Sequence, residues 1–356
     1  MKNNKLNYSG QKIIVGIDVH KKNWHITIIA NGLKVSSLSV PPYPNKLYSF
    51  LVKHFPNGDY YSVYEAGFSG FWAHRELCAL GIKNIIVNPA DIPTKTKERR
   101  RKTDKIDSEK LARELSAGSL EGIYVPDKQS EGFRALVRLR RQLSKDQSKV
   151  KNRIKSLLLF LGEDVPEDIN TKNWSQKYIN ALKELPIEVK ESKQTLDNLI
   201  QYLEVIRLQL AKVIKQLRIA VSNNHEARKI VELLMSIPGI GFTVGTIIYS
   251  EIMDIKRFKN LDQFASYVGL TPDVKASGER EHVKGLSKQS NDKLKNYIIE
   301  AAWIAIRKDP ALLMAYGKLK SRMSSGSAII RISKKLLNRI RYVWNNEKTY
   351  VLAVVE

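Results

Sequence analysis

The sequence predicts a mixed α/β domain, then a long helical linker, then a mainly helical C-terminal domain. Short runs rich in β-branched residues, separated by turn residues, fill residues 11–90. Apolar residues at helical spacing follow over residues 133–217. Beyond residue 230, two apolar helical segments flank a Pro-Gly turn. We therefore expect domains at 1–130, 131–225 and 226–356, which a chain of 356 residues is long enough to support.

The first strands are expected to form an antiparallel meander over residues 12–40. The runs KIIVGIDV, WHITIIA and LKVSSLSV are strand-like, and Asn31-Gly32 supplies a two-residue hairpin turn between the second and third. A helix and a strand then alternate twice over residues 45–89. This is the element order of RNase H-like nuclease domains, although a fold alone does not assign a function.

The charge balance points to a polyanionic partner. The chain has 60 Lys and Arg against 36 Asp and Glu, which gives a net charge of +24 and a pI near 9.8. Such an excess attracts nucleic acid, although a basic protein without catalytic activity shows the same bulk charge. The single cysteine excludes internal disulfides and suits a reducing compartment. With no signal-peptide pattern and no apolar run long enough for a bilayer, we expect a soluble cytoplasmic protein without a membrane partner.

Four carboxylates are candidates for a metal site. Asp18 lies near the end of the first strand and Glu65 at the end of the fourth, and these strands are neighbours in the expected sheet. Asp104 and Asp107 are three residues apart, on one face of a helix that begins near Thr103. Oxygen ligands suit Mg²⁺, and two such ions can hold the attacking and leaving oxygens of a phosphodiester.

Each of these acids, taken alone, has an ordinary explanation. Asp is common at strand ends, a strand-terminal Glu is usually solvated, and acids in a first helical turn complement the helix dipole. Four converging carboxylates, however, repel one another unless a cation offsets the repulsion, so the set favours a metal site. Four histidines show no metal-ligand spacing and are expected at the surface or in packing: His20, His25, His54 and His74.

Two groups of cations are candidates for nucleic-acid contact. A run directly before the paired aspartates would hold the backbone beside the metal: Arg99, Arg100, Arg101 and Lys102. The helix expected at 133–161 carries nine Lys or Arg and one Asp up to residue 155. A solvated face is the usual explanation of such charges, but these are nearly unopposed. We therefore expect phosphate contacts from Arg138, Arg140 and Arg141.

A second long helix is expected after Pro186. Its apolar residues step by three and four, as in a coiled coil of about three heptads. They are Leu196, Leu199, Leu203, Ile206, Leu210, Val213 and Leu217. This seam could pair with another subunit or with a helix of the same chain, and we favour another subunit.

The turn Pro238-Gly239-Ile240-Gly241 resembles a helix-hairpin-helix turn. In such turns, the glycine backbone amides, here those of Gly239 and Gly241, face a DNA phosphate. A tight packing turn between two helices explains the same residues equally well.

A serine in a polar, loop-like stretch is the remaining candidate. Ser277-Gly278 lies among four cations and before a helix that begins near Asn291. The cations are Lys275, Arg280, Lys284 and Lys288. Nearby cations would activate a serine hydroxyl and stabilise the pentacoordinate phosphate formed when it attacks DNA. From the local sequence alone, an ordinary Ser-Gly turn is the commoner explanation.

Taken together, these motifs resemble the DEDD insertion-sequence transposases. The N-terminal likeness rests on Asp18 in GIDVHKKNWHI, Glu65 in YEAG, and Asp104 and Asp107 in RRKTDKIDSEKLA. The C-terminal likeness rests on IPGIG and on FASYVGLTPDVKASGEREHVKGLSKQSNDKLKNYIIEAAW. It covers nearly the whole chain and implies an RNase H/RuvC-like domain, a helical coiled-coil linker and a C-terminal transposase domain whose nucleophile is Ser277.

The resemblance also implies a mechanism and partners. The four acids would hold Mg²⁺, with Mn²⁺ as a substitute, and the serine would become joined to a phosphate of donor or target DNA. A structured bridge RNA would choose both DNAs, and dimers would assemble into a tetramer in which serine and acids come from different subunits. The chain has Ser290 where a glycine is usual and Lys295 where an arginine is usual. Alternative functions are a metal-only, RuvC-like structure-specific nuclease and a non-catalytic nucleic-acid-binding scaffold.

Overall fold

The structure is a computed structural model that describes residues 7–93, 103–164, 173–277, 280–286 and 291–352. Of residues 273–277 and 280–284 it describes the backbone alone. The chain divides into two compact units, residues 1–125 and residues 126–356, which are described separately.

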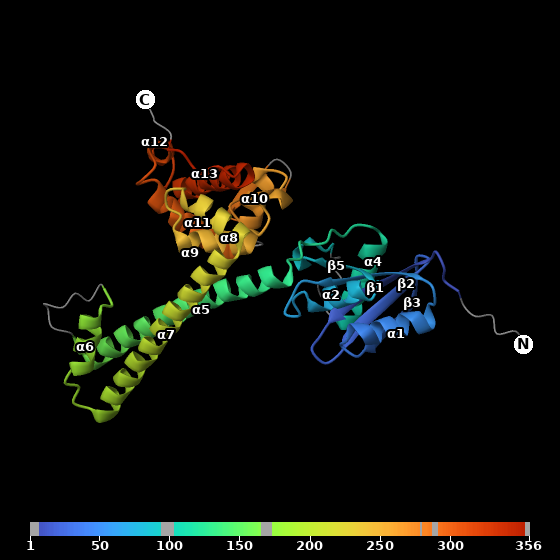
Figure 1. Cartoon of the computed structure of the whole chain (residues 1–356), viewed down its shortest axis with the longest axis horizontal. Helices are drawn as coiled ribbons and strands as arrows, with labels where there is room; N and C mark the ends of the chain where they lie inside the picture. The colour runs from blue at the N-terminus through green and yellow to red at the C-terminus, as the bar shows by residue number, and fades with distance from the viewer. Residues whose placement is uncertain (1–6, 94–102, 165–172, 278–279, 287–290, 353–356) are drawn as a thin grey trace, which may run out of the picture. The chain divides into compact units, whose positions relative to one another are not determined.

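A five-stranded mixed sheet forms the centre of the first unit (Figure 1). Its strands are β1 (Lys12–Val19), β2 (Trp24–Ala30), β3 (Leu33–Val40), β4 (Asp59–Glu65) and β5 (Lys83–Val87). Their order is β3-β2-β1-β4-β5, with β1, β2 and β3 antiparallel and β4 and β5 parallel to β1. The predicted meander and the predicted pairing of β1 with β4 are confirmed, and the topology is consistent with an RNase H-like domain.

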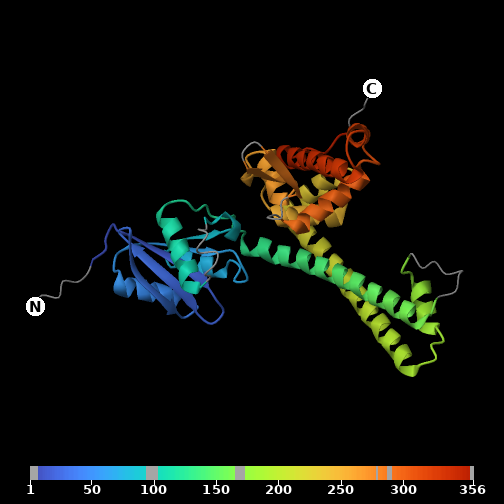
Figure 2. The same cartoon turned by 180° about the vertical axis from the view of Figure 1, so that it is seen from behind.

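Helices cover both faces of this sheet, because its strands carry apolar residues on both faces. On one face, Ile13, Val15 and Ile17 of β1 pack with α1 (Pro44–His54) and α2 (Trp72–Ala79). On the other face lies α4 (Asp104–Ser116), which is seen against the sheet in Figure 2. The short 3₁₀ helix η1 (Pro89–Asp91) follows β5.

Helix α4 lies directly on the sheet because Gly16 has no side chain. A Cβ at Gly16 would lie 2.1 Å from Ser108 O and 2.4 Å from Ala112 N, both backbone atoms of α4. A buried hydrogen bond of 2.8 Å between Thr27 Oγ1 and Ser108 Oγ fixes the same contact from β2. The start of α4 is therefore held at a defined position over β1.

Replacing Gly16 by alanine is expected to destabilise the first unit by about 3 kcal/mol or more, because the new methyl group would push two backbone segments apart. Thermal unfolding of the full chain would measure this loss. Gly132→Ala is the matched control, since nothing lies within 4 Å of a Cβ there. Equal melting temperatures for the two variants would contradict the close packing of α4 on β1.

A pair of long antiparallel helices opens the second unit. They are α5 (Lys128–Leu161) and α7 (Lys190–Asn223), and the short α6 (Gln176–Glu184) packs against α7. The predicted heptad seam of α7 packs against α5, as in the core formed by Val150 and Ile154 with Leu203. The expectation that this seam pairs with another subunit was therefore wrong, because the helix that covers it is α5 of the same chain.

Helices also make up most of the rest of this unit. They are α8 (His225–Met235), α9 (Phe242–Ile252), η2 (Ile255–Arg257), α10 (Leu261–Val268), α11 (Asp292–Ala305), α12 (Pro310–Lys320) and α13 (Ser325–Asn346). The polar stretch expected to be loop-like is instead a hairpin of β6 (Pro272–Ser277) and β7 (Arg280–Leu286). The mixed α/β domain and the helical C-terminal region are thus confirmed. None of the helices in the described residues is long and apolar enough to cross a membrane.

Candidate metal centre and the serine hairpin

Asp18 and Glu65 lie at the same edge of the sheet. The parallel pairing of β1 with β4 reaches Ile17 and Tyr64, and each acid is the next residue on its strand. Alternation along β1 gives Asp18 the same face as Gly16, which is the face that α4 covers. On β4, Glu65 likewise shares a face with Val63, which packs in the core on the α4 side.

The start of α4 brings the other two acids to this edge. Thr103 caps the helix, with its hydroxyl accepting a hydrogen bond from the Ile106 amide. Asp104 and Asp107 then occupy the first turn, and both act electrostatically on Asp18. Asp18 and Asp107 are half-buried, whereas Asp104 is exposed. The acids predicted from the sequence thus gather around one end of α4.

His20 joins this cluster, contrary to the expectation of a surface or packing role. Its Nε2 lies 3.1 Å from Asp18 Oδ2 and 3.5 Å from Asp104 Oδ1. Ligand atoms of these three residues lie within 4.8 Å of one another, a spacing that one cation can bridge. The signal in the sequence was the spacing Asp-Val-His at the end of β1, because residues two apart on a strand share a face.

Lys110 is a second member that the sequence analysis missed. Its ammonium nitrogen lies 3.6 Å from Glu65 Oε1 and 3.7 Å from Asp107 Oδ1, and its side chain is only 10% exposed. It follows Asp107 by one helical turn. A nearly buried ammonium group between two carboxylates offsets part of their repulsion.

The electrostatics of Asp18 fit a cation site. Burial raises the pKa of Asp18 above its usual 3.8, the charge and hydrogen bond of His20 lower it, and the charges of Asp104 and Asp107 raise it again. The net pKa is raised, so the ionised carboxylate is held at a cost that a bound cation would remove. Carboxylate oxygens suit Mg²⁺ and Mn²⁺, and the imidazole is a ligand that softer divalent metals also accept.

Of the predicted nucleic-acid contacts, Arg138 also forms an ion pair within the protein. Its guanidinium makes a bidentate ion pair with Glu251 of α9: Nε to Oε1 and Nη2 to Oε2, both at 2.9 Å. Glu251 is only 2% exposed. Arg138 therefore joins α5 to α9, and its side chain remains 42% exposed, so its contact with a phosphate stays a prediction. Arg140 lies 3.4 Å from the Tyr297 hydroxyl and Arg141 is half-buried, while Arg99, Arg100, Arg101 and Lys102 fall outside the described residues.

Glu251 is the centre of a network at the base of the β6–β7 hairpin. The Asn291 side chain donates to Glu251 Oε2 at 3.1 Å, and the Tyr267 hydroxyl donates to the Glu251 carbonyl at 2.9 Å. The Asn291 amide donates to the Tyr267 carbonyl at 3.0 Å. Tyr267 precedes the hairpin and Asn291 caps the helix after it. Both ends of the segment that carries Ser277 are thus tied to one buried residue, Asn291 to the Glu251 carboxylate and Tyr267 to the Glu251 backbone carbonyl.

Replacing Arg138 by alanine is expected to destabilise the protein by about 3 kcal/mol, because the buried Glu251 would lose its bidentate partner and keep only the charge of Arg134 nearby. Burial raises the pKa of Glu251, but the hydrogen bond and charge of Arg138 outweigh this effect, so the pKa lies below its usual 4.5. The stability from this pair is present above about pH 4.5 and is lost as the pH falls through the lower, folded-state value.

Chemical unfolding at several pH values would measure this. The gap in unfolding free energy between the native protein and Arg138→Ala should be full near neutral pH and should shrink in acid. Lys149→Ala is the control on the same helix, since Lys149 pairs with the exposed Asp146 and should change little. A gap that does not depend on pH would contradict the role of this pair.

The two glycines of the Pro-Gly turn have different explanations. Gly239 has φ +91°, and a Cβ there would lie 2.3 Å from the Ala301 carbonyl oxygen of α11. Packing of the turn against α11 therefore accounts for Gly239, as the alternative explanation held. Gly241 is exposed and precedes α9, with open space around it.

The serine candidate lies at the tip of the β6–β7 hairpin. Ser277 is the last residue of β6 and pairs in register with Arg280 of β7. Lys275 pairs with His282, and Lys284 also lies on β7. Lys288 falls outside the described residues. The hairpin places Ser277 at the end of β6, opposite Arg280 of β7.

Comparison with known proteins identifies the family. A family model for DEDD transposases of the IS110 type matches residues 15–162, and a second, described as "Transposase IS116/IS110/IS902 family", matches residues 231–317. The first match contains the four acids and the second contains Ser277.

Three transposases are similar to this chain at 22–29% identity. A putative transposase, y4rJ, of Sinorhizobium fredii is 29% identical over 296 residues, which cover 77% of this chain and 74% of that protein. The transposase for insertion sequence element IS1533 of Leptospira borgpetersenii is 25% identical, over 70% of this chain and 72% of its own. That for IS1111A of Coxiella burnetii is 22% identical, over 68% and 64%. With two family matches in the same order as the two motif sets, the chain belongs to the IS110 family of DEDD insertion-sequence transposases.

Proposed function

We propose that this transposase cuts and rejoins DNA through a covalent serine–DNA intermediate, with the acidic cluster as its metal centre. The observation that carries the proposal is the convergence of Asp18, Glu65, Asp104 and Asp107 around the first turn of α4. Carboxylates gathered in this way repel one another, and a divalent cation would make the arrangement favourable.

The four acids would be the metal ligands, and His20 is placed to join them or to orient Asp18. A divalent cation bound there supplies Lewis-acid stabilisation of the charge that develops on the phosphate oxygens. The chain's own residues do the rest of the work. Lys110 limits the repulsion within the cluster, and the packing of α4 at Gly16 keeps the first turn in place.

Ser277 would be the nucleophile. Its Oγ loses its proton and bonds to phosphorus, one ester bond between that phosphorus and deoxyribose breaks, and the departing oxygen takes up a proton. The serine–DNA linkage is again a phosphodiester, so rejoining exchanges one ester bond for another and needs no external energy source. Backbone placement at a hairpin tip, among Lys275, Arg280 and Lys284, supports this role because cations stabilise the pentacoordinate phosphate.

The partners are donor and target DNA, a bridge RNA that pairs with both, and further copies of the chain, as dimers that assemble into a tetramer. The net charge of +24 and the family resemblance support the DNA and RNA partners. The α5–α7 pair is closed within the chain, so the assembly would use surfaces other than the heptad seam.

A nicked DNA substrate, which prevents rejoining, provides the test. The full chain with its guide RNA and Mg²⁺ is expected to give a covalent protein–DNA adduct that resists denaturation and disappears with EDTA. Strand cutting that depends on Mg²⁺ but gives no adduct would replace this proposal by a metal-only nuclease. Binding without any cutting would leave only a nucleic-acid-binding scaffold.

A further inference from the structure

One strongly cationic region takes no part in the proposed chemistry. Residues 310–346, which contain α12 and α13, include eight Lys or Arg and not one Asp or Glu. α13 buries an apolar face formed by residues such as Ile332, Leu336 and Ile340, and its cations lie on the other faces. Most of this segment lies beyond the second family match, which ends at residue 317.

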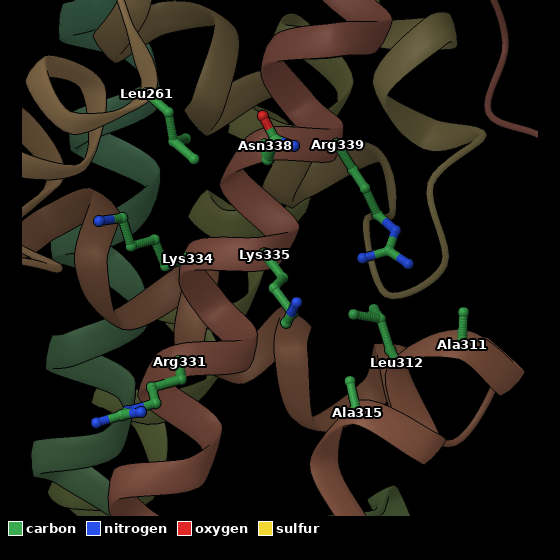
Figure 3. Close-up of a pocket in the computed structure, with 9 residues that line it drawn as sticks. All are labelled: Leu261, Ala311, Leu312, Ala315, Arg331, Lys334, Lys335, Asn338 and Arg339. Atoms are coloured by element: carbon green, nitrogen blue, oxygen red, sulfur yellow. The ribbon is translucent and has the colours of Figure 1, made fainter. Parts of the chain in front are cut away.

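The outer face of α13 borders a groove of about 560 Å³ (Figure 3). Figure 3 shows its lining: Leu261, Ala311, Leu312, Ala315, Arg331, Lys334, Lys335, Asn338 and Arg339. Lys335 and Arg339 point toward α12, whereas Arg331 and Lys334 point to the opposite side. A second hollow of about 490 Å³ shares Asn338 and Arg339 and continues along α13 past Tyr342. We call this combined surface the α13 groove.

The cations of the α13 groove differ in how far their charge is compensated. Arg339 lies 3.4 Å from the fully buried Asp309 and donates to the Tyr350 hydroxyl at 2.8 Å, so it shapes the groove. Lys334 pairs with the exposed Asp262 at 2.8 Å. Arg331 and Lys335 are exposed and form no ion pair with any residue that the structure describes. Two cations therefore present uncompensated charge, one helical turn apart.

We propose that the α13 groove binds the phosphate backbone of duplex DNA. Arg331 and Lys335 are exposed one helical turn apart, about 6 Å along α13, and their side chains point to opposite sides of the helix, so each can contact a phosphate where a DNA backbone crosses α13. The partly exposed Ala311 and Ala315 give the groove an apolar floor that offers contact to the sugars.

The described lining of the groove includes no acid, and the two acids beside it, Asp262 and Asp309, are paired with Lys334 and Arg339. A transposase must also hold DNA outside its cutting site. The proposal concerns binding only and does not depend on the serine chemistry.

Salt-dependent binding of a labelled DNA duplex of arbitrary sequence, followed by fluorescence anisotropy with the full chain, tests this. The double variant Arg331→Gln/Lys335→Gln should weaken binding about 3- to 10-fold near 0.1 M KCl. It should also reduce the slope of log K against log[salt] by about 1.8, since each phosphate contact contributes about 0.9. The matched control is Lys183→Gln/Lys193→Gln, which removes the same charge from two lysines already paired with Glu204 and Asp197.

The outcomes separate the alternatives. An unchanged slope with unchanged melting temperature would overturn the proposal, and so would an equal loss in the matched control, because that would show a general effect of net charge. A structured RNA of the same length serves as the competing probe. A larger loss of slope for RNA than for DNA would assign the groove to RNA and overturn the proposal. Because no strand cutting is measured, failure here leaves the serine–DNA proposal unaffected.

Discussion

Replacing Ser277 by alanine is expected to abolish the covalent adduct and to lower strand exchange by a factor on the order of 10³ or more, because the attacking oxygen is removed. DNA binding and thermal stability should remain near those of the native protein, since a hairpin-tip serine contributes little to folding. The nicked-substrate assay, run beside an anisotropy measurement of DNA affinity, separates the two effects.

Ser266→Ala is the matched control for this experiment. Ser266 is an exposed serine on α10 in the same unit, and its loss should leave adduct formation unchanged. Adduct formation by Ser277→Ala at the native rate would show that another residue is the nucleophile. Cutting at the native rate without an adduct would show that water attacks, as in a metal-only nuclease.

Much of the first unit could be predicted because its signals are local. Asn31-Gly32 gives the hairpin turn, β-branched runs give the strands, and Thr103 gives the start of α4. The convergence of the acids followed from one topological step, the pairing of β1 with β4. The contribution of Gly16 could not be predicted, because it depends on how closely α4 approaches the sheet.

The features that the sequence did not predict depend on contacts between distant residues. Arg138 is indistinguishable in sequence from a solvated cation, and only the fold brings Glu251, more than a hundred residues away, against it. The α7 seam predicted a helical partner correctly but not which helix, since heptads carry no information on chain identity. The hairpin at Ser277 was taken for a loop because its strands are polar and lack the alternation of a half-buried strand.

Replacing Asp18 by asparagine is expected to stabilise the folded protein while removing its activity. The pKa of Asp18 is raised in the folded state, chiefly by burial, above 3.8. A group whose pKa is higher in the folded state stabilises the fold at pH values below its unfolded-state pKa. That stabilisation is lost as the pH rises through its folded-state pKa. At neutral pH, the ionised carboxylate therefore costs stability, and asparagine removes this cost while it can still hydrogen-bond to His20.

Thermal unfolding in EDTA measures the first half of this expectation. Asp18→Asn should melt above the native protein near neutral pH, by roughly 2–4 °C for each kcal/mol relieved, and the advantage should vanish as the pH falls below about 4. Asp59→Asn is the control, because Asp59 is an exposed carboxylate at the far end of β4. A lower melting temperature for Asp18→Asn would contradict the cost assigned to the buried charge.

Titration with Mg²⁺ measures the second half. Binding of a cation to the folded state alone raises the native melting temperature, whereas Asp18→Asn lacks a ligand and should respond weakly. Removing that ligand should also cost several kcal/mol of transition-state stabilisation, a loss of about 10³-fold in strand cutting. A variant that is more stable without the metal, less responsive to it and inactive with it can be explained only if Asp18 is held ionised for a cation. A general folding defect would instead lower stability and activity together.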